Sequence, residues 1–351
     1  MSLRRDISRA RYAAAQGARV AWYMGHYLLA RRVSGPFDRP GEPKFRPQAA
    51  EGDNARIRDA FLDLFARDRA NIEAGLYPAP SDLGVAKALS ALKNSARFFE
   101  DLPRVDARRL QRSGVEVRAE AGDDARYPTY YLQNFHYQSG GWFTDDSAKL
   151  YDTQVEVLFG GAADAMRRIA IGTLVRALKG RDQRRVAHLD IACGNGRLLT
   201  QILAALPRLP ATGLDLSPAY CAEARARLAD YPQIDIVQGA VEQAPFETAS
   251  FDSATCVYLF HELPPRVRRE AAREIGRLIG PGGVLVLADS LQTGDTRDLD
   301  RMLEYFPVGF HEPYYGSYLK EDLEALFAEA GFVLEETELA FLTKVMRFRR
   351  V

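Results

Sequence analysis

Hydrophobic positions follow a regular rhythm in the second half of the chain. From residue 186 onward, short apolar runs alternate with stretches in which apolar residues recur at helical spacing. Strict alternation of strands and helices predicts a parallel sheet that is covered by helices on both faces. The expected strands are 186–191, 211–215, 234–238, 253–258 and 284–288, and the expected helices between them are 197–205, 218–229 and 266–279.

The end of the chain departs from this alternation. A helical pattern over 319–330 ends at Gly331, and two strand-like runs follow at 332–337 and 340–348. Their short connection predicts an antiparallel hairpin. The chain is therefore predicted to be an α/β protein with a mostly parallel, seven-stranded sheet that ends in an antiparallel hairpin.

The first half of the chain shows helical patterns without intervening strands. Residues 34–53 are rich in proline and glycine, which predicts a loop, and helical spacing begins again over 57–65. An aromatic segment at 127–143 (YPTYYLQNFHYQSGGWF) precedes two further expected helices, 147–159 and 162–178. We therefore expect three regions: a helical N-terminal extension over 1–125, an aromatic-rich lid with connecting helices over 126–180, and a ligand-binding domain over 181–351.

The first fifty residues contain an apolar run at 20–30 (VAWYMGHYLLA), which at 11 residues is too short to span a bilayer. Two arginines follow it, which argues against a cleavable signal peptide. The same fifty residues hold ten basic and three acidic side chains. Two interpretations are open: the run packs Trp22, Tyr23 and Leu28 on the rest of the protein, or it makes a weak peripheral contact with an anionic membrane.

Composition and charge narrow the possible partners and cofactors. The 351 residues include 47 basic and 47 acidic side chains, so the net charge is zero and nucleic acid is not an expected partner. The three cysteines form no C-x-x-C pair, which is typical of a reduced, cytoplasmic protein. The sequence shows no metal-ligand spacing, so no metal is predicted. The oligomeric state stays open.

The segment 188–199 (HLDIACGNGRLL) carries the clearest ligand-binding signal. It reads as a strand, a glycine-bearing turn and a helix, an arrangement in which Gly194 and Gly196 let the backbone approach a ligand. A dinucleotide site is one interpretation. That site requires a third glycine where Leu199 stands, and Asp190 on the strand would repel a phosphate group.

The same segment resembles the first motif of the class I S-adenosylmethionine-dependent methyltransferases, in which spaced glycines follow an acidic residue. Here the motif is Asp190-Ile-Ala192-Cys-Gly194-Asn-Gly196, with Ala192 in place of the first glycine. The cofactor of that family carries no phosphate, and a carboxylate near its amino and sulfonium groups is favourable. The resemblance implies a Rossmann-like fold and S-adenosyl-L-methionine as the cofactor.

Four further segments resemble this family, in the family's order. They are GLDLS (213–217), QGAVEQAPF (238–246), FDSATCVYLFHEL (251–263) and IGRLIGPGGVLVLAD (275–289). The resemblance covers about residues 185–351 and is nearest to the branch that includes the ubiquinone and menaquinone methyltransferases. The first 120 residues match no motif of the family.

The resemblance also implies which residues hold the cofactor. Asp215 stands at the end of the second strand, where a carboxylate can accept both ribose hydroxyls. Ala240 replaces the family's adenine-facing aspartate, and Glu242 is an alternative acceptor for the adenine amine. The complete set of expected cofactor-binding residues is Asp190, Ala192, Gly194, Gly196, Asp215, Leu216, Ala240, Val241, Glu242 and Tyr258.

Candidates for acid–base catalysis come from three places. His261 follows the fourth expected strand, at the sheet edge where ligands bind, although it equally suits loop packing. His136 lies in the aromatic segment, and Tyr151 stands where related enzymes place an aromatic residue near the cofactor. A histidine base helps when the acceptor is a phenol or hydroxyl. The resemblance further places His311, Tyr314 and Tyr315 in a stretch that often lines the substrate pocket.

The rings of the aromatic segment allow two interpretations. Tyr130, Tyr131, His136, Trp142 and Phe143 form the core between extension and catalytic domain, or they close as a lid over the acceptor. The lid interpretation predicts methyl transfer to a small, apolar or aromatic acceptor molecule.

Two other functions stay open beside methyl transfer. Ala192 and Ala240 depart from the family motifs and favour a catalytically silent, cofactor-binding scaffold protein. A nicotinamide-dependent oxidoreductase is disfavoured by Asp190 and Leu199, for the reasons given above. The identity of the acceptor and of the methylated atom does not follow from the sequence.

Overall fold

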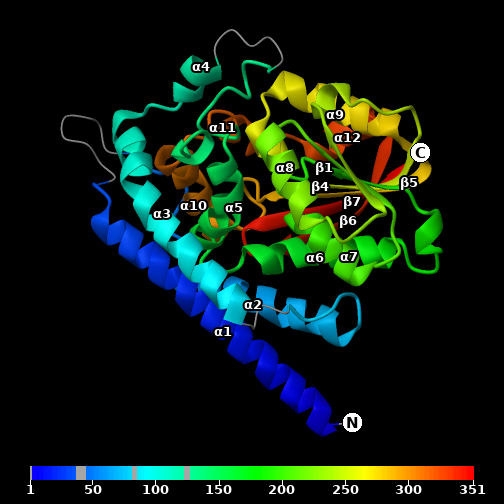
Figure 1. The fold of residues 1–351 in the computed structure, drawn as a ribbon, viewed down its shortest axis with the longest axis horizontal. Coiled ribbons are helices and arrows are strands. Elements are labelled where there is room, and N and C mark those ends of the chain that lie inside the picture. The colour runs from blue at the N-terminus through cyan, green and yellow to red at the C-terminus, as the bar shows by residue number, and fades with distance from the viewer. Residues whose placement is uncertain (1, 37–44, 81–84, 122–126) are drawn as a thin grey trace.

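The computed structural model describes residues 2–36, 45–80, 85–121 and 127–351. Its centre is a seven-stranded sheet in the order β3-β2-β1-β4-β5-β7-β6 (Figure 1). The strands are β1 (His188–Ile191), β2 (Ala211–Asp215), β3 (Ile234–Gln238), β4 (Phe251–Val257), β5 (Ile279–Ser290), β6 (Phe332–Ala340) and β7 (Thr343–Arg350). β1 to β5 pair in parallel, and β7 pairs antiparallel with both β5 and β6.

Helices cover both faces of the sheet, which gives an α/β, Rossmann-like fold (Figure 1). Successive side chains of a strand point to opposite faces. Leu285 and Leu287 of β5 pack with α9 (Pro265–Leu278) and α12 (Leu323–Glu329). Val286 packs on the other face, with α6 and α7. The remaining helices of this part are α6 (Ala163–Ala177), α7 (Arg197–Ala205) and α8 (Pro218–Arg227).

Several predicted elements have the predicted bounds, and one is wrong. β2, β3 and α7 begin and end where the pattern placed them. The single helix expected over 319–330 is instead a short α11 (Tyr315–Tyr318) followed by α12. The side chain of Asp322 accepts a hydrogen bond from the amide of Ala325 at 2.9 Å and caps α12. Such an N-cap starts a new helix, so the chain is interrupted there.

The N-terminal region is helical where the structure describes it. Its helices are α1 (Ser2–Val33), α2 (Asn54–Glu73), α3 (Val85–Gln111) and α4 (Glu116–Ala121), and α5 (Asp145–Leu158) follows the aromatic segment. α1 and α3 run side by side along the outside of the molecule, and α2 packs on α6 (Figure 1). The boundary predicted between residues 125 and 126 lies outside the described residues.

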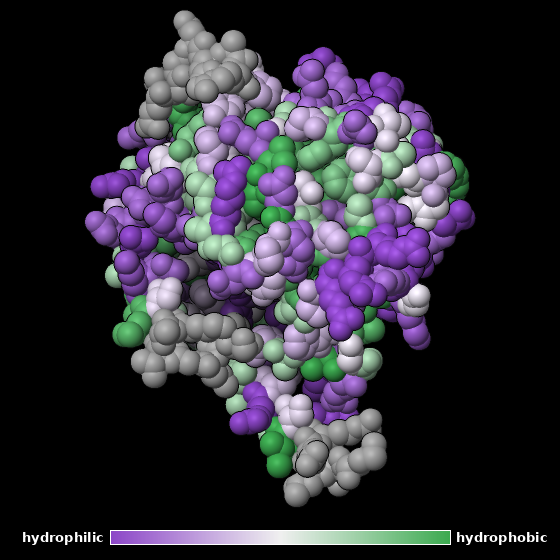
Figure 2. Space-filling view, turned by 45° about the vertical axis from the view of Figure 1, so that its right-hand side comes forward, coloured by the Kyte–Doolittle hydropathy of each residue, from purple (hydrophilic) through white to green (hydrophobic). Residues whose placement is uncertain are grey.

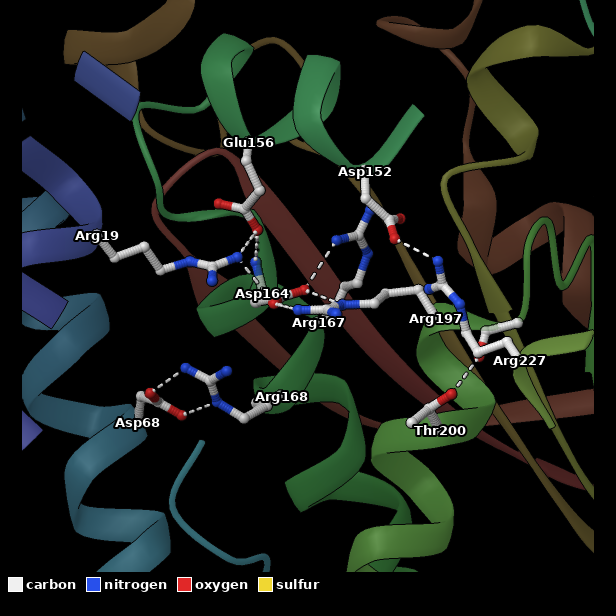
Figure 3. Close-up of polar contacts among 11 residues, drawn as sticks. Arg19, Asp68, Asp152, Glu156, Asp164, Arg167, Arg168, Arg197, Thr200 and Arg227 are labelled. Atoms are coloured by element: carbon white, nitrogen blue, oxygen red, sulfur yellow. Dashed lines mark hydrogen bonds and ion pairs between the residues drawn. The ribbon is translucent and has the colours of Figure 1, made fainter. Parts of the chain in front are cut away.

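A buried ion pair joins α2 to α6. Arg168 donates to both carboxylate oxygens of Asp68, at 2.8 and 2.6 Å (Figure 3). The hydroxyl groups of Tyr12 and Tyr77 donate to the same carboxylate at 2.6 and 2.9 Å. These contacts compensate the complete burial of Asp68. Removing one charge of such a pair destabilises a protein by about 3–5 kcal/mol, because the other charge stays buried.

A second buried carboxylate, Asp164 at the start of α6, connects α1 to the glycine turn. It contacts Arg19 of α1 at 2.9 Å, Arg167 at 3.1 Å and Arg197 of α7 at 3.2 Å (Figure 3). Glu156 of α5 pairs with the same Arg19 at 2.7 Å. Burial alone would raise the pKa of Asp164, but Arg197 and Arg19 hold it well below its usual range. Ion pairs through Asp164 therefore connect the N-terminal helix α1 to the start of α7, directly after the glycine turn.

The apolar run of α1 is only partly covered. Leu28 and Val33 are exposed, and Trp22 is 38% exposed. The expected packing of Leu28 is wrong, because His26 occupies the buried side of the helix and stacks on Phe99 at 5.2 Å between ring centroids. None of the described helices has the length and apolar character of a membrane span.

Polar side chains cover most of the face in Figure 2, with smaller apolar areas between them. Contact with an anionic membrane stays a prediction.

Candidate active site

A cavity lies at the carboxyl ends of β1, β2 and β4. Asp190, Asp215 and Val257 belong to these three strands and line it. This is the edge at which open α/β sheets bind ligands. The aromatic segment and α5 supply further lining residues, namely Tyr130, Tyr131, Phe135, Trp142 and Tyr151. Of the expected cofactor-binding residues, Asp190, Ala192, Gly194, Asp215, Leu216, Ala240, Val241 and Tyr258 line the cavity.

The turn after β1 presents backbone to this cavity. Gly194 has a φ of +55°, and a Cβ placed there would have one neighbour within 4 Å, the ring of Tyr220 at 3.9 Å. Ala192 also has a positive φ, of 54°, which is strained for a residue with a Cβ. α7 begins directly after the turn, so its free amides lie beside the cavity.

Gly196 serves the packing of the fold and does not line the cavity. Its φ is +77°, and a Cβ there would lie 3.1 Å from Leu228 and 3.3 Å from Ala224. The expectation that both glycines make room for the ligand is therefore wrong for Gly196. This glycine lets α7 approach α8 closely.

Two carboxylates flank the turn, Asp190 buried and Asp215 partly buried. Asp215 accepts hydrogen bonds from the amides of Gly194 and Ser217 at 2.8 and 2.9 Å. Asp190 accepts one from Thr255 Oγ1 at 2.6 Å, and its other oxygen has no hydrogen-bond partner among the described residues. Burial raises the pKa of Asp190 to about 7, although the hydrogen bond from Thr255 lowers it. Burial likewise raises the pKa of Asp215 to about 6, although its backbone hydrogen bonds lower it. A cation in the cavity would favour the ionised forms.

Glu242 lies outside the cavity lining, contrary to its expected role as an adenine acceptor. Its Oε1 accepts a hydrogen bond from the hydroxyl of Tyr130 at 2.8 Å. Because the ring of Tyr130 lines the cavity, Glu242 positions a ring of the aromatic segment. Ala240 and Val241, its neighbours in the sequence, line the cavity themselves.

The aromatic segment packs against the cofactor-binding strands and α8. Trp142 is buried, and its ring lies 5.5 Å from those of both Tyr151 and Tyr220. The hydroxyl of Ser217 donates to the backbone carbonyl of Trp142, which joins the segment to the end of β2. Phe143 instead packs on Tyr127 and Tyr131 and does not line the cavity. Trp142 is therefore buried like a core residue and also lines the cavity, so it is compatible with both the core and the lid interpretation.

His261 is held by Asp289, a residue at the end of β5 that the sequence reasoning missed. His261 Nδ1 lies 2.5 Å from Asp289 Oδ1, and the amide of Phe260 donates to Asp289 Oδ2 at 2.8 Å. Burial alone would lower the pKa of His261, but Asp289 raises it to about 9. His261 itself does not line the cavity, although Tyr258 and Glu262 on either side of it do.

Comparison with known proteins agrees with this geometry. Residues 189–283 match the family model described as "Methyltransferase domain". A demethylmenaquinone methyltransferase of Staphylococcus aureus is 26% identical over an alignment that covers 41% of this chain and 67% of that protein. These two matches identify the chain as an S-adenosylmethionine-dependent methyltransferase. S-adenosyl-L-methionine is therefore its cofactor, and the nicotinamide and catalytically silent alternatives are set aside.

Solved structures of methyltransferases share parts of the fold. A putative sarcosine dimethylglycine methyltransferase from Galdieria sulphuraria has a TM-score of 0.43 and 15% identity, and covers 56% of this chain and 88% of that one. The CurJ carbon methyltransferase has a TM-score of 0.49 and 15% identity, and covers 99% of this chain and 93% of that one.

The methyltransferase brings together three residues that the sequence did not connect. His136, Glu262 and Glu312 each have one potential ligand atom within 4.8 Å of those of the other two. The prediction that no metal is bound rested on spacing along the chain, whereas these residues come from distant segments. Burial raises the pKa of Glu262 to about 7, against the attraction of His261, and raises that of Glu312 well above its usual range.

The stretch after β5 surrounds this cluster without lining the cavity. His311 Nε2 lies 2.8 Å from Gln133 Oε1, and the hydroxyl of Tyr315 lies 2.6 Å from Ser290 Oγ. The cavity lining does not include His311, Tyr314 or Tyr315. The expectation that this stretch lines the substrate pocket therefore does not match this cavity. Glu312 was missed because an acidic residue between aromatic ones, in FHEPYY, carries no motif of its own.

Proposed function

We propose that the methyltransferase holds S-adenosyl-L-methionine along the edge formed by residues 190–241. The lining fits that cofactor, because Asp190 has a carboxylate oxygen without a described hydrogen-bond partner, suited to the amino or sulfonium group. Asp215 supplies the carboxylate for the ribose hydroxyls, and Gly194 leaves space for close approach. Ala240 and Val241 supply the surface for the adenine. The cofactor contributes an electrophilic methyl group, and the chain binds and orients it.

Asp215 provides the test of this part of the proposal. Asp215→Ala should weaken S-adenosylhomocysteine binding by about 1.5–3 kcal/mol, the range for a hydrogen bond to a charged group. Isothermal titration calorimetry measures the effect. Asp215→Asn is the matched control, because its side chain has the same shape as that of aspartate and retains one acceptor oxygen. Equal affinity in the wild type and a folded Asp215→Ala variant would remove Asp215 from the cofactor site.

We infer that the acceptor is a small, apolar or aromatic molecule that binds between the aromatic segment and the turn after β4. The support is the set of rings that line this end of the cavity, namely Tyr130, Tyr131, Phe135, Trp142 and Tyr151. The relative from Staphylococcus aureus is a demethylmenaquinone methyltransferase, and its name indicates a quinone-type small molecule as its acceptor. Aromatic walls also favour the cationic cofactor.

The pair His261–Asp289 is the observation that carries the proposed chemistry. Asp289 binds Nδ1 of His261, which leaves Nε2 for exchange of a proton with the acceptor. The raised pKa of His261, about 9, is close to that of a phenol, so the neutral ring accepts a phenol or enol proton at little cost in free energy. Because most of the ring is already protonated at pH 7, we expect kcat to rise as the pH approaches 9. The deprotonated acceptor then attacks the methyl group in line, while Asp289 acts as a positioning residue.

Methyl transfer from labelled cofactor to a panel of phenols and quinols, with mass spectrometry of the products, tests the acceptor class. His261→Gln should lower kcat by about 10²–10⁴-fold, the usual contribution of a general base, with little change in S-adenosylhomocysteine affinity. His311→Gln is a matched control, because that histidine pairs with Gln133 and His261 pairs with Asp289. An unchanged kcat in His261→Gln would rule out this base.

A further inference from the structure

One histidine and two glutamates meet beside the acceptor end of the cavity. His136 comes from the aromatic segment, Glu262 from the turn after β4, and Glu312 from the connection between α10 (Arg297–Gly309) and α11. His136 Nε2 lies 3.1 Å from Glu312 Oε1, and all three ligand atoms lie within 4.8 Å of one another. Ligands at about 2.0–2.2 Å from one ion lie about 3 Å apart, so the cluster needs only a small contraction to hold an ion.

Glu312 is a buried acid that no arginine or lysine side chain pairs with among the described residues. Its side chain is 0% exposed, and neither carboxylate oxygen has a hydrogen-bond partner among the described residues. Asp68 and Asp164 are also buried, but arginine side chains pair with both of them. A buried carboxylate without such a partner is unfavourable. A positive ion at the cluster would supply the missing partner.

The donor atoms indicate the kind of ion. His136 offers an imidazole nitrogen to the cluster, and Glu262 and Glu312 each offer a carboxylate oxygen. Imidazole nitrogen suits iron, nickel, copper and zinc, whereas carboxylate oxygen suits magnesium, calcium and manganese. One nitrogen with two carboxylates therefore favours Mn²⁺, Fe²⁺, Co²⁺ or Zn²⁺. A second histidine lies beside the cluster, with His261 Nε2 3.9 Å from Glu262 Oε1.

We propose that His136, Glu262 and Glu312 bind one divalent first-row transition-metal ion. Three protein ligands leave coordination positions open for other ligands. Because Glu262 also lines the cavity, the ion would lie beside the bound acceptor, where it suits an acceptor that carries an oxygen donor. The proposal does not depend on the acceptor proposed above, since cation binding needs neither cofactor nor acceptor.

Co²⁺ is the probe for this site, because its visible absorption reports direct coordination. Full-length protein without a histidine tag is treated with a chelator and titrated with Co²⁺, by absorption and by calorimetry. The wild type should bind one equivalent per chain. Glu312→Gln and His136→Gln should each lower the affinity about tenfold or more, because each removes a direct ligand. Mn²⁺ should compete with Co²⁺ for the same site.

Two controls separate loss of the ligand from loss of the fold. His311→Gln changes a neighbouring histidine outside the cluster and should bind Co²⁺ as the wild type does. S-adenosylhomocysteine binding shows whether each variant is folded. A folded Glu312→Gln variant that binds Co²⁺ like the wild type would overturn the proposal, as would a wild type that binds no Co²⁺. Should Glu312→Gln fail to fold, His136→Gln decides by the same criteria.

Discussion

The two ends of the cavity are built in different ways. The cofactor end comes from β1, β2 and the exit of β3, within residues 190–241. Asp215 accepts two backbone hydrogen bonds there, whereas Asp190 has one carboxylate oxygen without a partner among the described residues. The proposed acceptor end is lined by the aromatic segment and the turn after β4, and the buried Glu312 lies close to Glu262 of that turn.

This difference indicates where each end can tolerate change. Backbone geometry forms the cofactor end, so a side chain added there excludes the ligand. Side chains from distant segments form the acceptor end, so changes there alter packing and chemistry while the turn keeps its shape. The following variants test this distinction, from the largest expected effect to the smallest.

Gly194→Val should abolish detectable cofactor binding, which corresponds to a loss of more than about 100-fold in affinity. A valine at a φ of +55° is strained, and its side chain would enter the cavity. Calorimetry with S-adenosylhomocysteine measures the loss. Gly196→Val should differ, because its side chain would meet Leu228 and Ala224 and lower the melting temperature. Normal binding by Gly194→Val would show that the ligand does not approach this backbone.

Trp142→Ala should lower the free energy of unfolding by about 3–5 kcal/mol, the usual cost for a buried aromatic ring. Phe143→Ala should cost less, because Phe143 is only partly buried and packs within the aromatic segment. Chemical denaturation gives both values, and kcat and cofactor affinity are measured on the folded variants. The lid interpretation requires that turnover falls more than cofactor affinity. Loss of stability alone would assign these rings to the core.

Asp190→Asn should raise the stability of the cofactor-free protein at pH 8 by about 1–4 kcal/mol. The pKa of Asp190 is raised to about 7 in the fold, so the folded state binds a proton more tightly than the unfolded state does. The contribution of Asp190 therefore makes the free energy of unfolding fall as the pH rises from about 4 through 7. The side-chain amide of the Asp190→Asn variant does not titrate, so this contribution is absent from the variant. Denaturation at pH 5 and pH 8 measures it. The variant should also bind the cofactor more weakly, and a gain at pH 5 equal to that at pH 8 would contradict the explanation.

Ala192→Gly should raise the free energy of unfolding by about 1 kcal/mol, because glycine adopts a φ of 54° without the steric cost of a Cβ. Cofactor affinity should stay within about twofold, since the turn keeps its shape. Ala249, which has a φ of 56° in a loop outside the cavity, gives a matched control as Ala249→Gly. A loss of stability in Ala192→Gly would show that the alanine side chain contributes packing that outweighs the strain.

The sequence allowed most of the sheet and the cofactor end to be predicted, because both depend on patterns within short segments. The strand, turn and helix around Asp190 are consecutive, and their order alone places the turn at the sheet edge. The differences at this end concern packing. Gly196 lies against α8 and the side chain of Glu242 binds Tyr130, and both contacts depend on how other segments pack on the sheet.

The acceptor end could not be predicted to the same extent, since its residues meet only after the chain has folded. Asp289 reaches His261 across 28 positions of sequence, through the parallel pairing of β4 with β5. The sequence could have indicated Asp289, because it is the acidic residue near the end of an apolar strand. Glu312 reaches His136 from much farther along the chain, and no local pattern marks it.

The contacts of Asp164 limit which parts of this protein can be exchanged with those of a relative. A chimera that takes its N-terminal helices from another methyltransferase has to bring a cation to the position of Arg19 and a carboxylate to that of Asp68. Otherwise the recipient keeps Glu156 and Arg168 buried without their partners. Recombination points that keep α1, α2, α5 and α6 from one parent avoid this incompatibility, so these four helices are inherited best as one block.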